Sequence, residues 1–238
     1  MKIALVGYGK MGKAIEEIAV SKGHEIVVKI NIDNLEDFSQ DNLRLADVAI
    51  EFTGPQSAVG NIKQCIRWGI PVVSGSTGWL EQWNEVEYFC MQHNGGLVYA
   101  SNYSIGVNLF FELNKKLADL MKNHTEYKAS LEEIHHTEKK DAPSGTAITL
   151  AEQILIASSI KKQWVNRYSE NPEDLVIQSK RVDPAAGTHS VRYDSDIDDI
   201  QITHTAHNRK GFAGGAVLAA EFIPGRTGIY SMKDVLHL

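Results

Sequence analysis

The sequence predicts an α/β protein of two domains: an N-terminal doubly wound parallel sheet and a C-terminal α+β domain with a mixed open sheet. Two observations lead to this prediction. From residue 1 to about residue 104, short apolar runs alternate with helical patterns, as in a parallel sheet covered by helices. Later, strand-like runs at 175–181, 190–193 and 200–205 follow one another with little helix between them, which is typical of mixed or antiparallel pairing.

The first element is the apolar run 3–6, which is typical of a strand buried on both faces. It leads directly into Gly7-Tyr8-Gly9-Lys10-Met11-Gly12, and a helical pattern then continues to Gly23. A G-x-G-x-x-G turn between a strand and a helix, with a second apolar strand at 26–30, predicts a dinucleotide site whose pyrophosphate lies on the helix N-terminus. The alternative is that these glycines only shape a turn in some other α/β protein.

The end of the second strand is where a dinucleotide site places an acidic residue against the ribose hydroxyls. Asn31 and Asp33 are the candidates. Neither is followed by an arginine that would hold a 2′-phosphate, which favours NADH, but Lys29 could still reach a phosphate. Both NADH and NADPH therefore remain open.

The alternation of strands and helices continues through the first domain. The polar segment 34–46 is expected to be a loop. The elements expected after it are a strand at 47–52, a helix at 56–67, a strand at 71–73, a helix at 80–91 and a strand at 97–100. Since the carboxyl ends of parallel strands share one edge, the loops that follow these strands form the expected ligand edge of the sheet.

The pattern changes after Gly106. The second domain is expected to contain a helix at 107–121, a strand at 127–134, a helix at 147–157, an irregular segment at 161–174 and then the three strands named above. A helix rich in small residues is expected at 212–222, and the last ten residues could rejoin the first domain. We therefore predict a dinucleotide-binding domain from 1–104 and 213–238, and a substrate-binding and oligomerisation domain from 105–212.

One stretch, residues 133–146, carries an unusual density of chemical groups. It reads Glu133-Ile134-His135-His136-Thr137-Glu138-Lys139-Lys140-Asp141-Ala142-Pro143-Ser144-Gly145-Thr146. Two imidazoles, two ammonium groups and an expected helix N-terminus are the parts needed to hold an anion and move a proton. Taken alone, the same residues would also suit a solvated loop.

Composition narrows the classes of function. The net charge of −6 and the pI near 5.8 exclude a general basic field, so we expect neither nucleic acid nor membrane as a partner. Cys65 and Cys90 are read as free thiols in a reducing compartment, and with no long apolar run this predicts a cytoplasmic protein. No metal is expected at His135 and His136, because adjacent strand residues point to opposite faces.

Several further motifs appear in order and at fitting intervals along the whole chain. They are residues 7–12, Glu51-Phe52-Thr53, Gly75-Ser76-Thr77-Gly78, residues 102–106, His135-His136 with Lys139, residues 141–147, residues 212–216 and residues 231–236. Together they resemble the 4-hydroxy-tetrahydrodipicolinate reductase (dihydrodipicolinate reductase) family, and residues 133–147 are close to diagnostic of it.

The resemblance implies an NAD(P)H-dependent oxidoreductase that reduces 4-hydroxy-tetrahydrodipicolinate to tetrahydrodipicolinate in diaminopimelate and lysine biosynthesis. It implies His135 as the proton donor, with Lys139 as a second acid residue. A dicarboxylate substrate would be held by Lys139, His136 and the amides of Gly145 and Thr146. The cofactor contacts that it implies, together with Asp33, are Gly7, Tyr8, Gly9, Lys10, Met11, Gly12, Gly75, Ser76, Thr77, Ala100, Ser101, Asn102 and Tyr103. The family precedent is a homotetramer assembled through the sheet of the second domain.

Two other functions are compatible with parts of the chain. Another two-domain NAD(P)-dependent amino-acid dehydrogenase would account for residues 1–104 but not for residues 133–146. A non-catalytic NAD-sensing protein would have no need of a proton donor. His189, His204 and His207 receive no functional assignment, since an isolated histidine in a β-rich segment more often serves as a structural hydrogen-bonding group.

Overall fold

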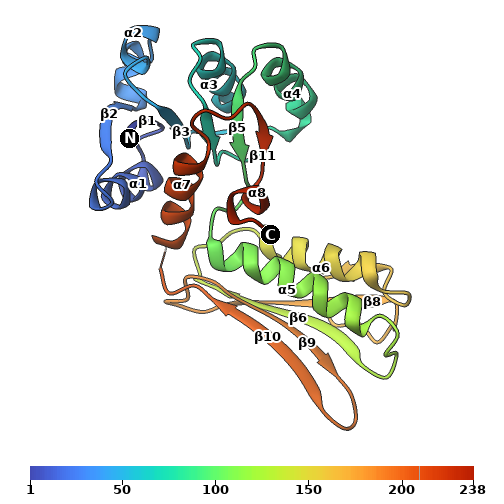
Figure 1. Cartoon of the computed structure of the whole chain (residues 1–238). Helices are drawn as coiled ribbons and strands as arrows, with labels where there is room; N and C mark the ends of the chain where they lie inside the picture. The colour runs from blue at the N-terminus through green and yellow to red at the C-terminus, as the bar shows by residue number, and fades with distance from the viewer. Residues whose placement is uncertain (209) are drawn as a thin grey trace. The chain divides into compact units, whose positions relative to one another are not determined.

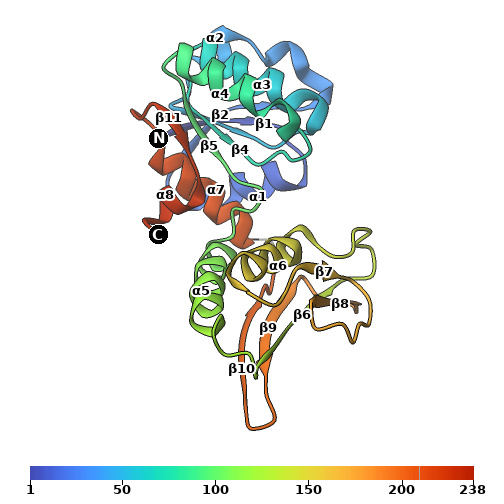
Figure 2. The same ribbon diagram turned by 90° about the vertical axis from the view of Figure 1, so that its right-hand side faces the viewer.

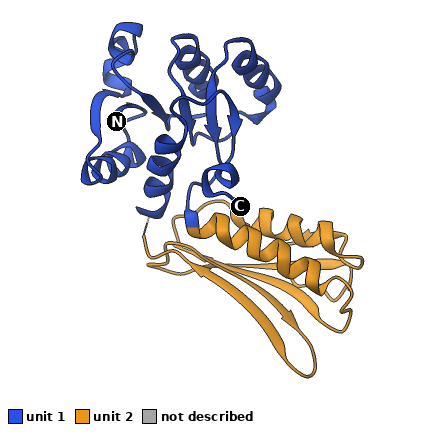
Figure 3. Cartoon of the chain, viewed as in Figure 1, with its two compact units in different colours: residues 1–105, 210–238 blue, residues 106–209 orange. Residues whose placement is uncertain are grey.

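The computed structural model of the chain describes residues 1–208 and 210–238. It divides into two compact units, residues 1–105 with 210–238 and residues 106–209, shown in Figure 3. Among the described residues, no helix combines the length and the apolar character that a bilayer crossing requires.

Unit 1 is built on a six-stranded parallel sheet with the strand order β11-β5-β4-β3-β1-β2. Its strands are β1 (Lys2–Val6), β2 (Glu25–Ile30), β3 (Val48–Glu51), β4 (Val72–Ser74), β5 (Gly96–Tyr99) and β11 (Gly228–Tyr230). Its helices are α1 (Lys10–Ser21), α2 (Gln40–Leu43), α3 (Pro55–Arg67), α4 (Trp83–Gln92), α7 (Lys210–Phe222) and α8 (Met232–Leu236). The end of the chain thus adds a strand to the edge of the first sheet.

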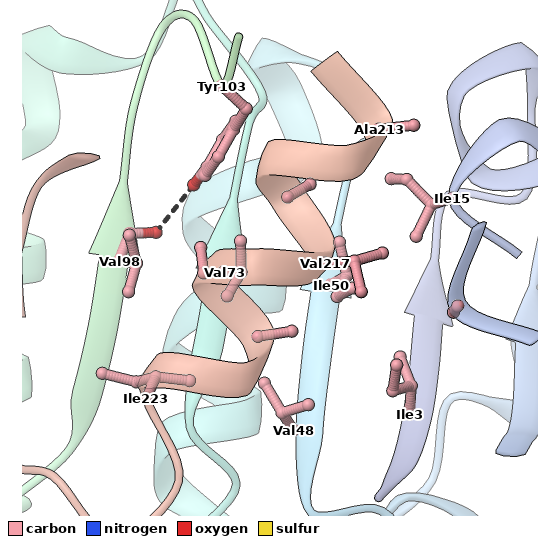
Figure 4. Packing of buried hydrophobic residues seen from close by; sticks show 14 of the residues in the cluster. Ile3, Ile15, Val48, Ile50, Val73, Val98, Tyr103, Ala213, Val217 and Ile223 are labelled. Carbon is pink, nitrogen blue, oxygen red and sulfur yellow. Dashed lines mark hydrogen bonds between the residues drawn. The ribbon is translucent and has the colours of Figure 1, made fainter. Parts of the chain in front are cut away.

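Helices cover both faces of this sheet, as Figures 1 and 2 show. One face packs against α1, α7 and α8 through a cluster that includes Ile15, Val217 and Met232. Figure 4 shows Ile15 and Val217 of this cluster beside side chains of the strands. The other face packs against α3 and α4 and buries both free cysteines, Cys65 and Cys90. The sheet is therefore doubly wound, as predicted from the continuous apolar runs of its strands.

Unit 2 is built on a five-stranded mixed sheet with the strand order β10-β9-β6-β8-β7. Its strands are β6 (Lys128–His135), β7 (Gln163–Val165), β8 (Asp174–Arg181), β9 (Thr188–Asp194) and β10 (Asp199–Thr205), and its helices are α5 (Ile105–Met121) and α6 (Gly145–Ala157). Strand β6 pairs parallel with β8 and antiparallel with β9. Helices α5 and α6 lie side by side on one face of the sheet (Figures 1 and 2), where Phe110, Leu150 and Leu131 share one core.

The fold class predicted from the sequence is confirmed, but two local predictions are wrong. The segment 34–46 is not simply a loop, because a 3₁₀ helix spans Ile32–Asp37 and α2 follows it. The segment 161–174 contains the short strand β7, which pairs with β8. Both segments are short and polar, so side-chain caps and edge pairing stabilise them, and these leave little trace in hydrophobic periodicity.

Candidate active site

The glycine turn of unit 1 connects β1 to α1. A Cβ at Gly7 would lie 2.1 Å from the carbonyl oxygen of Phe52, and a Cβ at Gly12 would lie 2.6 Å from the carbonyl oxygen of Gly7. Both contacts are too close for any side chain, so these two glycines are required by the fold itself. Gly9, the residue before the first turn of α1, has no atom within 4 Å of its Cβ position, and no side chain caps the helix there. Open space beside uncapped amides is what a phosphate group needs.

The predicted cofactor residues all belong to unit 1. They follow the carboxyl ends of four strands: Gly7, Tyr8, Gly9, Lys10, Met11 and Gly12 after β1, Asp33 after β2, Gly75, Ser76 and Thr77 after β4, and Ala100, Ser101, Asn102 and Tyr103 after β5. Because these strands are parallel neighbours in one sheet, the structure brings the residues to one edge. Their contacts with a cofactor remain a prediction.

Glu51, the last residue of β3, joins the loop after β3 to the loop after β4. Its side chain is fully buried. One carboxylate oxygen, Oε1, accepts hydrogen bonds from the Thr53 amide (3.0 Å), the Thr53 hydroxyl and the Ser76 hydroxyl (2.8 Å). The other, Oε2, accepts from the Ser74 hydroxyl at 2.6 Å. No individual role was predicted for Glu51 from the sequence. An acidic residue that ends an apolar strand at the ligand edge could have been recognised as a candidate.

Tyr103 lies in the core of unit 1 rather than on its surface. Its ring is 2% exposed, and its hydroxyl lies within hydrogen-bonding distance of the carbonyl oxygens of Ser74 (2.7 Å) and Val98 (3.0 Å), the second of which is drawn in Figure 4. Burial raises the pKa of this phenol well above its usual value. The side chain of Tyr103 therefore supports the loop after β5 and does not present its hydroxyl to a ligand.

The structure distinguishes Asn31 from Asp33 at the end of β2. Asn31 caps the 3₁₀ helix, its amide donating to Asn34 Oδ1 at 2.7 Å, whereas Asp33 is exposed on the first turn of that helix. The ammonium group of Lys29 forms an ion pair with Glu16 at 2.6 Å and lies 5.0 Å from the centre of the Tyr8 ring. Asp33 is thus available to ribose hydroxyls, while Lys29 already has an anionic partner.

The predicted substrate site lies in unit 2, where strand alternation places Glu133 and His135 on the same buried face of β6 as Leu131. Glu133 is fully buried and His135 is 8% exposed. On the neighbouring strands, Glu133 faces His189 of β9 and His135 faces Arg181 of β8 in register. The pairing of three strands therefore gathers groups that are far apart in the sequence.

Glu133 is the centre of this group. Its Oε1 accepts hydrogen bonds from Arg181 Nη2 at 3.1 Å and from the Ser144 amide at 3.2 Å, while its Oε2 lies 3.0 Å from His135 Nδ1 and 3.9 Å from His189 Nε2. Burial alone would raise the pKa of Glu133, but the contact with His135 and the hydrogen bonds from Ser144 and Arg181 hold it well below its usual value. We call these five residues, Glu133, His135, Ser144, Arg181 and His189, the Glu133 cluster.

The cluster contains a second imidazole that the sequence analysis left as structural. His189 Nε2 lies 3.0 Å from Ser144 Oγ, and the His189 ring stands edge to face with that of His135 at 5.0 Å between centres. Burial, and then the neighbouring His135, lower the pKa of His189 to about 4. His189 is therefore neutral at physiological pH. The spacing of Glu133 and His135 on an expected strand indicates that these two side chains lie on one face. The positions of Arg181 and His189 beside them depend on strand register, which the spacing does not give.

Glu133, His135 and His189 also offer ligand atoms within 4.8 Å of one another, a spacing that a divalent cation could use. Arg181 and the Ser144 amide already occupy Oε1 of Glu133, and Ser144 Oγ already lies against His189 Nε2. A guanidinium group in direct contact with a ligand carboxylate disfavours a cation there. We therefore treat the cluster as an ion-pair network, and the expected absence of a metal remains a prediction.

The remaining predicted substrate residues follow β6 directly. Lys139 Nζ forms an ion pair with Asp141 at 2.7 and 2.8 Å, and its hydrogen bond lowers the pKa of that carboxyl. Arg181 donates to the carbonyl oxygens of Lys139 (3.3 Å) and Asp141 (2.6 Å), and so fixes this loop to the Glu133 cluster. His136 lies on the loop beside Asp183, and contributes to lowering the pKa of that carboxyl after the hydrogen bonds from Thr137.

Gly145 and Thr146 form the first turn of α6. Ser144 is the N-cap, and its hydroxyl accepts the hydrogen bond of the Ala147 amide at 3.2 Å. The Cβ position of Gly145 has no atom within 4 Å. The helix dipole favours negative charge at this end, and the open space beside Gly145 suits a carboxylate. Since Ser144 also donates its amide to Glu133, the same residue joins the start of α6 to the cluster.

Comparisons with known proteins cover the whole chain. Residues 1–103 match the family model "Dihydrodipicolinate reductase, N-terminus", and residues 106–236 match the model "Dihydrodipicolinate reductase, C-terminus". The 4-hydroxy-tetrahydrodipicolinate reductase of Christiangramia forsetii is 50% identical over 237 residues, which are 99% of this chain and 98% of that protein. The enzyme of the same name from Methanoregula boonei is 34% identical over 81% of this chain and 75% of its own length.

Solved structures share the fold. A dipicolinate-bound dihydrodipicolinate reductase from Paenisporosarcina sp. TG-14 superposes with a TM-score of 0.76 at 21% identity, covering 97% of each chain. An amine dehydrogenase from Mycobacterium smegmatis has a TM-score of 0.61 at 10% identity, covering 98% of this chain and 95% of its own. These likenesses concern the fold, whereas the family models and the 50% identical relative settle membership. The chain belongs to the dihydrodipicolinate reductase family and is an NAD(P)H-dependent oxidoreductase.

Proposed function

We propose that this protein reduces 4-hydroxy-tetrahydrodipicolinate to tetrahydrodipicolinate with NADH or NADPH, in the cytoplasm, on the route to diaminopimelate and lysine. The observation that carries this proposal is the Glu133 cluster. It joins the His135 imidazole, the loop of Lys139 and the N-terminus of α6 in one network inside unit 2. A proton donor and two anion-holding groups are what a dicarboxylate substrate of this reaction requires.

The reaction adds one hydride and one proton to the substrate and releases one water. A bound nicotinamide supplies the hydride. His135 supplies the proton, because an imidazole transfers protons readily near neutral pH. Lys139 exchanges its ion pair with Asp141 for one with a substrate carboxylate, and the amides of Gly145 and Thr146 hold a carboxylate at the start of α6. His136 contributes a further contact to the bound dianion.

Within unit 1, the residues present fit a dinucleotide. The open side of Gly9 and the uncapped start of α1 suit the pyrophosphate, and the exposed Asp33 suits the ribose hydroxyls. Because Lys29 is paired with Glu16, and Asp33 would repel a 2′-phosphate, we propose that NADH binds more tightly than NADPH. Fluorescence titrations with both cofactors test this preference. Equal or tighter binding of NADPH would contradict it.

The function is tested by following loss of nicotinamide absorbance with freshly generated 4-hydroxy-tetrahydrodipicolinate. Turnover that depends on both substrates is the expected result. Calorimetric titration with dipicolinate, the ligand named for the Paenisporosarcina protein, provides a second readout that needs no turnover. Absence of turnover with either cofactor would overturn the proposal.

We further propose that the chain assembles as a homotetramer through the open face of the second sheet. The helices of unit 2 cover one face only, and a hollow on the other face is lined by polar side chains that include Glu132, Gln178 and Arg192. A broad sheet face of this kind suits pairing with copies of itself. Sedimentation analysis is expected to give four chains per particle, and a monomer across the working concentration range would contradict this.

A further inference from the structure

We propose that Glu133 is a positioning residue for proton transfer. Its carboxylate holds the proton of His135 on Nδ1, so that Nε2 is the nitrogen that delivers a proton to the substrate. This inference rests on the proposed function and deepens it, because it names the atom and the residue that selects it.

The first observation is that two buried atoms have only each other. Glu133 Oε2 and His135 Nδ1 lie 3.0 Å apart, and neither has a hydrogen-bond partner elsewhere among the described residues. The contact does not have the alignment of a linear hydrogen bond, and its attraction depends on a proton on the ring nitrogen. A buried nitrogen next to a buried carboxylate is stabilised when that nitrogen carries a proton. This fixes Nδ1 as the protonated position.

The second observation is that Glu133 has donors other than His135 that favour its charged form. Arg181 and the Ser144 amide both donate to Oε1, on the side of the carboxylate away from His135. Together with His135 they hold the pKa of Glu133 well below its usual value, against the opposing effect of burial. The oxygen that faces His135 therefore belongs to an ionised group at every pH at which the enzyme would work.

The third observation concerns the other nitrogen of His135. Among the described residues, Nε2 makes no hydrogen bond. Unlike Nδ1, it is not fully buried. Gly187, which has φ of +152°, leaves space beside it, since a Cβ there would lie 3.1 Å from Nε2. Nε2 is thus the nitrogen with room for a reacting atom, whereas Nδ1 is enclosed.

The charged and titratable groups around His135 come from each neighbouring segment. They are Glu133 on its own strand, Arg181 on β8, His189 on β9, and Lys139, paired with Asp141, on the following loop. His189 is neutral at physiological pH because burial and His135 lower its pKa to about 4. Glu133 is therefore the anionic group in contact with His135, and Arg181 and Lys139 are the nearby cations.

Glu133→Gln tests the inference sharply because the geometry fixes which way the new amide must lie. Two N–H donors meet at the position of Oε1, so the amide oxygen must occupy it. The amide NH₂ then faces His135 Nδ1, which has to become an acceptor. We expect the proton of the neutral ring to move to Nε2 and the imidazolium to become less favourable.

The expected results follow from that reversal. With Glu133→Gln, kcat falls by about a hundredfold, and the alkaline limb of the kcat profile moves to lower pH by about one unit. The affinity for NADH, measured by fluorescence, stays unchanged. Glu152→Gln is the control, since Glu152 is exposed on helix α6 of the same unit and lies outside the Glu133 cluster. We expect wild-type turnover and an unmoved pH profile for it.

Nitrogen NMR of protein labelled at histidine decides the tautomer without substrate or turnover. In the wild type the neutral His135 ring is expected to carry its proton on Nδ1, and in Glu133→Gln on Nε2. A wild-type proton on Nε2, or an alkaline limb of Glu133→Gln that coincides with that of the wild type, would overturn the inference. If the protein failed to reduce the proposed substrate but the wild-type ring carried its proton on Nδ1, the function alone would be refuted. Should Glu133→Gln not fold, the wild-type spectrum still decides.

Discussion

Two buried glutamates, one in each unit, show that the role of a carboxylate depends on the groups that surround it. Glu51 and Glu133 are both fully buried at the end of a strand or near it. Glu51 is surrounded by hydroxyl groups and one amide, which donate hydrogen bonds and carry no charge. Glu133 is surrounded by a guanidinium group, an amide and two imidazoles.

The difference between these surroundings suits the two glutamates to different roles: Glu51 to holding loops in place and Glu133 to controlling the protonation of His135. Hydroxyl and amide donors do not change their protonation near neutral pH, so we propose that Glu51 only fixes the loops after β3 and β4, the second of which carries predicted cofactor residues. An imidazole does change its protonation in that range, so Glu133 can set the charge and the tautomer of His135. We therefore propose that the same side chain supports the shape of the predicted cofactor site in one unit and the chemistry of the predicted substrate site in the other.

The largest effect should come from removing the proton donor itself. His135→Gln is expected to lower kcat by about 10²–10⁴-fold, as loss of a general acid does, with little change in NADH affinity because the cofactor residues lie in unit 1. Steady-state kinetics and NADH titration measure the two quantities. Unchanged turnover would show that His135 is not the proton donor, and the proposed role of Glu133 would then also be wrong.

The second effect is on the stability of the protein at acid pH, and it tests the electrostatic surroundings of Glu133. The pKa of His189 is about 4 in the folded chain against an ordinary value of 6.5, so the unfolded state binds the proton first as the pH falls. The free energy of unfolding should therefore decrease by about 2 kcal/mol between about pH 7.5 and pH 5 through this residue. Glu133 also stabilises the folded state, because its pKa is lowered. That contribution is lost only as the pH falls below about 4.5, the ordinary carboxyl value, and so lies outside this pH range.

Urea denaturation of the wild type and His189→Gln at both pH values measures this contribution. His189→Gln also loses the contact with Ser144, so the quantity to compare is the change between the two pH values in each protein. A smaller change in the variant is expected. Equal changes in both proteins would mean that His189 is not held neutral by its surroundings.

A third, smaller effect is expected for Glu51→Gln. The new NH₂ group can face the Ser74 hydroxyl, which rotates to accept from it, while the amide oxygen keeps the bonds from Thr53 and Ser76. We expect a loss of roughly 1–2 kcal/mol of stability and weaker NADH binding through the loosened loop. Thermal unfolding and NADH titration measure these changes. A loss of turnover at saturating NADH would contradict a purely holding role.

The smallest effect tests the glycine turn. Gly9→Ala adds a methyl group into open space, so the fold should be unaffected, but dinucleotide binding should weaken by about fivefold, on the order of 1 kcal/mol. Gly12→Ala is the contrasting variant, because its Cβ would lie 2.6 Å from the Gly7 carbonyl oxygen and must disturb the turn itself. NADH binding by Gly9→Ala equal to that of the wild type would place the pyrophosphate elsewhere.

The sequence predicted what depends on local pattern. The strand, glycine turn and helix at residues 1–21 and the change of rhythm after Gly106 follow from periodicity, and the structure contains them. The helix predicted at 147–157 is also present, but it begins at Gly145. The family resemblance is confirmed by the two family models and the 50% identical relative. The roles of the individual site residues remain predictions.

The contacts that the sequence left unassigned depend on register across strands. His189 lies 54 positions from His135, yet it faces Glu133 because β9 pairs with β6 in one particular alignment. Arg181 reaches Glu133 because β8 pairs with β6 on the other side. Strand order and register are set by the packing of the whole sheet, so single-residue patterns could place Glu133 and His135 on one face but could not name the groups that surround them.

The most direct test of the two roles is a paired pH profile of kcat for Glu133→Gln and Glu51→Gln at saturating NADH. The account predicts that the alkaline limb moves to lower pH only for Glu133→Gln, while the profile of Glu51→Gln keeps the wild-type shape. An alkaline limb that moves equally in both variants, or in neither, would contradict the assignment of proton control to Glu133 and of holding to Glu51.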